Sequence, residues 1–218
     1  MLGMCGRYTN LMSWREIVEL YRLTEGSFRP NLAPRLDIRP TTDVVIVRQR
    51  HDGAREGAMV RWWLVPPWAK ELSSEYPMFN ARAETVAERK SFAGPFKHRR
   101  CLIPASGFYE WKAEGGKRKT RYYITSKSGA PLTFAGLWER NTNLDIESCT
   151  IIVTSPNKTM AAIHNRMPVI LAEDDCDAWL TEPHRDLLRP APDDDLIAYP
   201  VPSDIKDEDP PEVLARPS

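Results

Sequence analysis

The chain has 218 residues with no net formal charge, and 42% of them are hydrophobic, which suffices for one well-packed domain. No apolar run approaches the roughly 18 residues of a membrane helix, and the start, MLGMCGRYTN, lacks the basic and apolar stretches of a secretory signal. The four cysteines and four histidines are widely spaced, which argues against a metal site. We therefore expect a monomer of the cytoplasm that binds neither a metal nor another cofactor.

The zero net charge hides a division between two parts of the chain. Residues 82–121 contain eleven Lys/Arg against four Asp/Glu, a net charge of +7. Residues 172–218 contain four Lys/Arg against fourteen Asp/Glu, a net charge of −10. A basic middle suits a polyanionic partner, although two solvated faces of opposite charge would give the same pattern.

The first hundred residues combine one clear helix with a hairpin. A capping box, Ser13 with Glu16, opens an amphipathic helix over residues 13–22. Three prolines make residues 27–42 an extended loop, and two strands follow at residues 43–50 and 58–65. The segment ARAETVAERKSF predicts a helix over residues 81–92.

The remainder of the chain is rich in strands. They are expected at residues 99–105, 107–112, 121–126, 131–139, 149–155 and 167–171, with short helices at residues 157–165 and 173–181. Residues 203–218 are polar and proline-rich and predict a loose or docked tail. The chain shows no repeat or linker, so residues 1–218 predict a single compact α+β domain around a mostly antiparallel, barrel-like sheet.

Met4 and Cys5 raise the possibility of a reactive N-terminus. If translation starts at Met4, its removal would leave Cys5 as the first residue, with an amine pKa of about 8 and a thiol pKa of about 8.5. Such an amine can form a Schiff base with an aldehyde, and the thiol can then close a five-membered thiazolidine. The alternative is a buried structural cysteine in an N-terminal strand.

Four further segments carry candidate site residues, each with a structural alternative. Asn80 and Arg82 offer an amide and a phosphate-binding guanidinium, or a helix N-cap and a surface residue. Trp68, after two prolines, suits base stacking, although packing also explains the tryptophans around it. Glu110 lies between aromatic residues on a strand, where its pKa would be raised, unless the strand is an edge that faces water.

His164 lies where a short helix gives way to a strand, and Arg166 follows two residues later. Side chains at such a bend often converge on a site. The alternative is a structural histidine that bonds to the backbone, which is the more common role of a lone histidine.

Taken together and in this order, several segments closely resemble the SRAP family, the SOS-response-associated peptidase proteins, which shield abasic sites in single-stranded DNA. The segments are MCGRY, NARAET, IPASGFYEW, AGLWE, IIVTSPN and IHNRMPVIL. The resemblance runs from Met4 to about Val201. It implies a DNA-damage protein with a compact α+β fold around a bifurcated, barrel-like sheet, which joins the nucleoid when DNA is damaged.

The resemblance also implies roles for individual residues. Cys5 would be the nucleophile that crosslinks to the ring-opened sugar, and Asn80 would hold both. Glu110 would relay protons, and His164 would assist opening of the sugar and reversal of the crosslink. The DNA contacts would come from Arg7, Trp68, Arg82, Arg89, Lys90 and Arg166, with Thr154 as a weaker candidate.

This sequence departs from the family pattern in three places. Residues 1–3 precede Met4, so either they are a leader that is removed or the start is misassigned, because Cys5 needs a free amine. Asp37 replaces an asparagine, where its carboxylate would either repel phosphate or orient the amine. Trp63 replaces a glycine, where it would either narrow the cleft or pack.

Three functions remain open at this stage. The first is covalent capture of abasic sites, with strand-cleaving lyase chemistry as an associated activity. The second is an autocatalytic or general cysteine peptidase that uses Cys5, His164 and Glu110, which would explain removal of the leader. The third is a nucleic-acid-binding module in which the cysteine is structural.

Overall fold

The computed structural model describes residues 5–24, 29–73 and 75–216. The predicted leader at residues 1–3, and Met4, lie outside the described residues. Within the described part of the chain, no helix is long and apolar enough to span a membrane.

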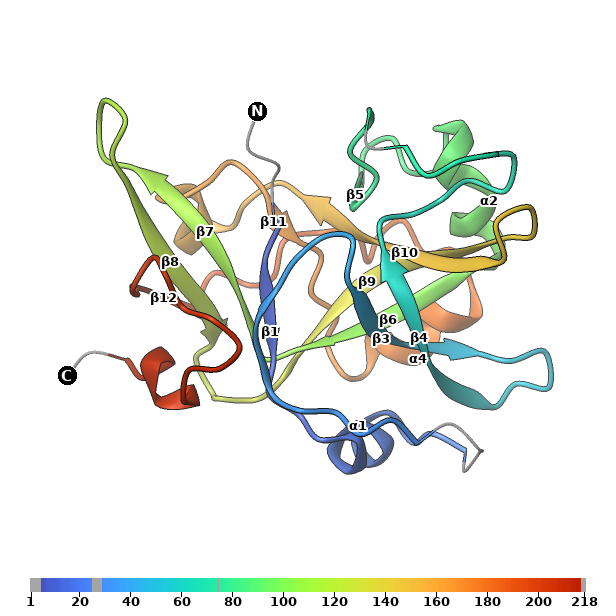
Figure 1. Ribbon diagram of the computed structural model, residues 1–218, viewed down its shortest axis with the longest axis horizontal. Coiled ribbons are helices and arrows are strands. Elements are labelled where there is room, and N and C mark those ends of the chain that lie inside the picture. The colour runs from blue at the N-terminus through green and yellow to red at the C-terminus, as the bar shows by residue number, and fades with distance from the viewer. Residues whose placement is uncertain (1–4, 25–28, 74, 217–218) are drawn as a thin grey trace.

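Five strands close into a barrel, because each pairs with the next and the last pairs with the first (Figure 1). In order around the barrel they are β4 (Arg55–Trp62), β3 (Asp43–Gln49), β6 (Arg100–Ala105), β9 (Leu132–Asn141) and β10 (Ile146–Thr154). The closing pair of β10 with β4 is parallel and the others are antiparallel. Two short strands extend the sheet along β10, namely β5 (Asn80–Arg82) and β11 (Met167–Pro168).

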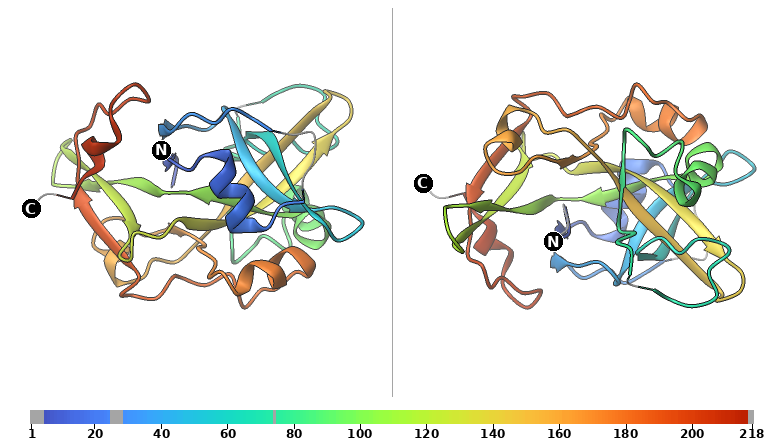
Figure 2. Two further views of the ribbon diagram at one scale, coloured as in Figure 1. Left: turned by 90° about the horizontal axis from the view of Figure 1, so that it is seen from below. Right: turned by 90° about the horizontal axis from the view of Figure 1, so that it is seen from above.

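A second, antiparallel sheet stands beside the barrel. Its strands are, in spatial order, β12 (Leu196–Pro200), β8 (Lys119–Ser126), β7 (Gly107–Ala113), β1 (Tyr8–Asn10) and β2 (Arg35–Ile38). The chain passes from the barrel strand β6 to β7 through Ser106 alone. The tail and β12 lie at one end of the molecule and the barrel turns at the other (Figure 2).

Short helices pack against the sheets: α1 (Trp14–Tyr21), α2 (Lys90–His98), α3 (Lys158–Ala161), α4 (Asp175–Thr181) and the 3₁₀ helix η1 (Pro211–Leu214), the last against the second sheet. The predicted capping box of Ser13 and Glu16 is present at the start of α1. The buried Arg100 donates hydrogen bonds to the carbonyl oxygens of Phe96, in α2, and Trp179, in α4. Its positive charge therefore ties the ends of two helices to the barrel.

The α+β fold and its mostly antiparallel, barrel-like sheet are confirmed, but the helix predicted over residues 81–92 is wrong at its start. Asn80–Arg82 form β5, which pairs with β10 and buries Ala81 completely, and α2 begins only at Lys90. This long-range pairing overrides the local helix propensity. The predicted loop at residues 27–42 likewise contains β2.

The C-terminal tail is docked rather than loose as far as residue 216. Ile205 and Leu214 are buried against the second sheet. The carboxylate of Asp207 accepts hydrogen bonds from the backbone nitrogens of Leu36 (2.7 Å) and Asp37 (2.8 Å). The tail therefore satisfies backbone donors of the edge strand β2 that would otherwise need water.

Candidate active site

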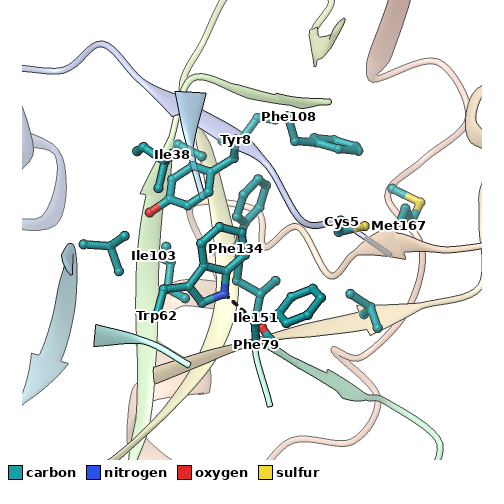
Figure 3. Close-up of a cluster of buried hydrophobic side chains, with 14 of the residues drawn as sticks. Cys5, Tyr8, Ile38, Trp62, Phe79, Ile103, Phe108, Phe134, Ile151 and Met167 are labelled. Atoms are coloured by element: carbon teal, nitrogen blue, oxygen red, sulfur yellow. Dashed lines mark hydrogen bonds between the residues drawn. The ribbon is translucent and has the colours of Figure 1, made fainter. Parts of the chain in front are cut away.

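Cys5 lies just before β1, at the junction of the two sheets. The backbone nitrogen of Cys5 donates a hydrogen bond of 2.6 Å to Oε1 of Glu110. Cys5 is only 3% exposed and packs at the margin of the barrel core, where Figure 3 shows its sulfur beside Met167. Burial raises the pKa of the Cys5 thiol well above its ordinary range, and the nearby charge of Glu110 raises it further.

Glu110 occupies the middle of β7, between β1 and β8, so the alternative of a water-facing edge strand is wrong. Its alternation with its neighbours is as predicted: Phe108 packs in the barrel core, and Tyr109 packs on the other face of the sheet. Glu110 is 3% exposed. Burial raises the pKa of its carboxyl, and this outweighs the lowering by the charge of His164 and the hydrogen bond from Cys5.

His164 follows α3 and precedes β11, at the predicted bend. Its charge interacts with Glu110, so the fold brings these two predicted residues together across 54 positions of the sequence. Its Nδ1 accepts a hydrogen bond of 3.2 Å from the backbone nitrogen of Arg166. Neutral His164 in this arrangement carries its hydrogen on Nε2, where it can donate to a reacting group.

Asn80 begins β5 directly after Phe79, which shares the core cluster of Cys5. It lies opposite Ile151 of β10 and is half-buried. The alternative that Asn80 caps a helix is wrong, because the residue belongs to a strand. Its side chain therefore comes from the barrel side of the junction, whereas that of Glu110 comes from the second sheet.

Two arginines follow the site residues closely along the chain. Arg7 lies two residues after Cys5, forms an ion pair of 3.3 Å with Asp37 and lies 5.4 Å from the Trp111 ring. Arg166 lies two residues after His164 and forms an ion pair with Glu84. Each guanidinium group is therefore already paired with a carboxylate. A phosphate could bind there only by displacing that carboxylate or by sharing the arginine with it.

The other predicted DNA contacts differ in their exposure. Arg82, Arg89 and Lys90 are exposed, and Nζ of Lys90 lies 4.7 Å from the centre of the Trp68 ring. Trp68 is 46% exposed, as expected after two prolines. Thr154 is buried and its hydroxyl donates to the carbonyl oxygen of Leu188, which places it below the surface that the others share.

The two substitutions relative to the family pattern have structural roles. Asp37 is buried and contacts three arginines, Arg7, Arg39 and Arg121, so its charge is compensated. Trp63 is half-buried and packs against the barrel core, with its ring centre 5.4 Å from that of Phe79.

Sequence reasoning missed Arg121. Its side chain is fully buried, with the guanidinium 3.7 Å from the centre of the Tyr109 ring. An arginine in a strand is usually solvated, and the sequence carries no signal that this one is buried.

In the part of the chain that the structure describes, no group of three or more His, Cys, Asp or Glu residues is arranged to hold a metal ion.

The fold and the site define a class of protein: a small α+β barrel protein with a cysteine, a buried carboxyl and a histidine gathered near its N-terminus. The family model described as SOS response associated peptidase (SRAP) matches residues 4–208. The chain belongs to this family.

Relatives and solved structures agree with this assignment. The chain is 39% identical to the abasic site processing protein YoaM of Bacillus subtilis over 92% of both chains, and 39% identical to YoqW of the same bacterium over 92% and 93%. A Bordetella bronchiseptica structure matches with a TM-score of 0.78 and 28% identity, over 91% of this chain and all of the other. A Bacteroides thetaiotaomicron structure with 23% identity and a TM-score of 0.85 shares the fold, over 98% of this chain and all of that one.

Proposed function

We propose that this protein, once its chain begins at Cys5, processes abasic sites in single-stranded DNA by forming a covalent thiazolidine crosslink. One observation carries the proposal: the backbone nitrogen of Cys5 lies 2.6 Å from Oε1 of Glu110. In a chain that begins at Cys5, this nitrogen is the α-amine, and a proton acceptor is already in contact with it. The curated relatives YoaM and YoqW, both named abasic site processing proteins, support the choice of substrate.

The crosslink forms in two steps that require no oxidant or metal. The α-amine of Cys5 adds to the C1′ aldehyde of the ring-opened sugar, and loss of water gives an imine. The thiol then adds to the imine carbon, and its proton passes to the nitrogen, which closes the five-membered ring. Because the imine also acidifies the hydrogens on C2′, loss of a proton from C2′ with departure of the 3′ phosphate from C3′ is the associated lyase reaction.

The environment of Glu110 suits proton transfer in both steps. Its raised pKa brings the carboxyl closer to neutrality, where a group both accepts and releases protons efficiently. It takes a proton from the Cys5 amine and returns one to the departing hydroxyl. It also accepts the thiol proton, which burial otherwise holds tightly on sulfur.

His164 and Asn80 complete the site in this proposal. His164, with hydrogen on Nε2, donates to the sugar ring oxygen as the ring opens, and assists reversal of the crosslink. Asn80 supplies an amide that can hold the terminal amine and the sugar hydroxyls. The abasic nucleotide has to be splayed out to reach a nucleophile at this depth, which a stacked duplex prevents.

The DNA backbone would bind through the basic residues around the site. Arg7 and Arg166 hold the phosphates that flank the abasic sugar, and Arg82, Arg89 and Lys90 extend this contact. Trp68 stacks on an unpaired base. Contacts of this kind bind without sequence preference and weaken as salt rises.

The decisive experiment compares proteins that differ only at the N-terminus. Protein that begins at Cys5 should form a heat-stable adduct with an oligonucleotide that contains one abasic site. The same protein with Cys5→Ser should form only an imine, which is lost on heating unless it is reduced with borohydride. Protein with residues 1–4 retained should form neither. If the Cys5-start protein binds both intact and abasic strands equally and forms no adduct, the cysteine is structural and the proposal is wrong.

Self-removal of the leader is a second candidate function, favoured by the same contact. The Cys5 nitrogen is the leaving group when the peptide bond before Cys5 is hydrolysed, and Glu110 is placed to protonate it. Intact-mass measurement on the untagged full chain tests this activity. Loss of residues 1–4 from the wild type, but not from Glu110→Ala or Cys5→Ala, would establish it. Equal processing of all three proteins would assign the cleavage to another enzyme.

A further inference from the structure

An ion pair joins two segments of the site that adjoin different strands, β5 and β11. Glu84 lies in the turn after β5, and its Oε1 accepts a hydrogen bond from Nη1 of Arg166, just before β11. The Glu84 side chain is 51% exposed and that of Arg166 only 21%. Burial is the largest single influence on the Glu84 carboxyl and raises its pKa, but the hydrogen bond and charge of Arg166, with contributions from the Glu84 backbone and from Arg82, together lower that pKa below its ordinary value. The carboxylate is therefore ionised at neutral pH.

The same arginine also contacts the histidine of the site through its backbone. The Arg166 nitrogen donates to Nδ1 of His164. This bond requires Nδ1 to be free of hydrogen, so it selects the tautomer with hydrogen on Nε2. The bond depends on the position of the short segment from His164 to Arg166, which is anchored by the pair with Glu84.

We infer that Glu84 is a positioning residue that holds Arg166 and thereby keeps His164 in the Nε2–H tautomer beside Glu110. This inference rests on the proposed function, because it assigns His164 a reacting partner. It also means that Glu84 lowers DNA affinity. Its carboxylate occupies a guanidinium that a phosphate would otherwise bind, and it lies close enough to Arg82 to interact with that charge as well.

Glu84 should have two effects of opposite sign: it weakens DNA binding and it speeds crosslinking. A residue with a merely structural role would not change affinity and rate in opposite directions. Glu84→Gln removes a carboxylate next to two arginines, so binding of an intact single strand should tighten about threefold, the scale of an exposed ion pair. The same change loosens the segment that carries His164. The rate of crosslinking at saturating abasic DNA should therefore fall about tenfold, as is typical when a residue that orients an active-site histidine is lost.

The test uses Cys5-start protein in the wild-type, Glu84→Gln and Glu88→Gln forms. Glu88 is a matched control: it lies in the same connection between β5 and α2, its side chain is 69% exposed, and it contacts only Arg185 at 3.9 Å among the ion pairs of the described residues. Nitrogen-15 spectra of the histidine rings report the tautomer of His164 without DNA. Single-turnover kinetics and binding to an intact strand report rate and affinity separately.

The inference holds if Glu84→Gln alone shifts His164 toward a mixture of tautomers and slows the reaction at saturation. It is overturned if the His164 spectrum and the saturated rate match those of Glu88→Gln. If no form of the protein makes an adduct, the proposed function fails, and the tautomer spectra still decide whether Glu84 positions the histidine.

Discussion

Two buried carboxylates, on strands that flank β1 in the same sheet, have opposite surroundings. Asp37 on β2 is in contact with three guanidinium groups, and one of them belongs to the fully buried Arg121. Glu110 on β7 accepts a hydrogen bond from the Cys5 nitrogen and is influenced by the charge of His164. The first carboxylate is compensated by fixed positive charge, whereas the second is left with a raised pKa and can exchange protons.

Under the proposed function, this difference distinguishes a structural carboxylate from a reactive one. The arginines around Asp37 also connect distant segments: Arg121 donates to the tail carbonyl of Ser203, and Arg7 lies two residues from Cys5. A compensated carboxylate thus stabilises the frame of the site. Glu110, in contrast, has no arginine paired with it in the described part of the chain, and its burial raises its pKa, which is common among residues that act as acids or bases.

Replacement of Asp37 by alanine should destabilise the protein by about 3–5 kcal/mol, because Arg121 would remain buried without its counter-charge. Urea denaturation of wild type and variant measures this change. Replacement of Glu19, whose side chain is 63% exposed in a surface pair with Arg15, is the control and should cost only about 0.5 kcal/mol. If both replacements lower the free energy of unfolding equally, Asp37 contributes no more to stability than an exposed carboxylate does.

Replacement of Glu110 by glutamine should have an effect opposite to that of Asp37→Ala. It should stabilise the protein by about 1 kcal/mol at neutral pH. The folded-state pKa of Glu110 is raised above its ordinary value of 4.5. Between these two pKa values the folded state binds more protons than the unfolded state, so wild-type stability falls as pH rises through that window. Glutamine does not titrate, and it still accepts the hydrogen bond from Cys5.

The advantage of Glu110→Gln should therefore shrink on acidification and vanish below pH 4.5. Thermal denaturation at several pH values checks this dependence. Glu114→Gln, at an exposed position just beyond the end of β7, should give no such trend. If the gain in stability from Glu110→Gln does not change with pH, the pKa of Glu110 is not raised in the folded protein.

Replacement of Arg39 by alanine should cost less than about 1 kcal/mol, although Arg39 forms the shortest of the three contacts with Asp37, 2.5 Å from Nη2 to Oδ2. Its side chain is 55% exposed, so water replaces the lost bond. Urea denaturation of Arg39→Ala, in parallel with the wild type and Asp37→Ala, measures this loss of stability. If Arg39→Ala destabilises the protein as much as Asp37→Ala does, the exposure of an arginine does not determine its contribution to stability.

The sequence predicted the reactive carboxylate more successfully than the structural one. Period-two alternation in GFYEWK placed Glu110 and Phe108 on one face, and the end of a short helix placed His164 at a bend. These are local patterns, and the structure confirms both placements. The roles assigned to these residues in catalysis remain predictions.

The features that sequence reasoning missed depend on contacts between distant segments. The helix predicted over residues 81–92 failed because β5 pairs with β10, about 70 residues further along the chain. Arg121 and Asp207 look like surface residues in the sequence, and only the folded chain brings them to β2. The composition of the tail left open whether it is loose or docked, and only the buried Ile205 and Leu214 show that it is docked.

The backbone of Cys5 has a φ angle of 45°, in the left-handed region that residues with a Cβ atom rarely adopt. This torsion is defined by the carbonyl carbon of residue 4, so it exists only while the peptide bond to that residue is intact. Its cost, about 1–2 kcal/mol, disappears when that bond is hydrolysed. Relief of this strain therefore adds about 1–2 kcal/mol to the free energy that favours hydrolysis of the bond before Cys5 in the folded protein.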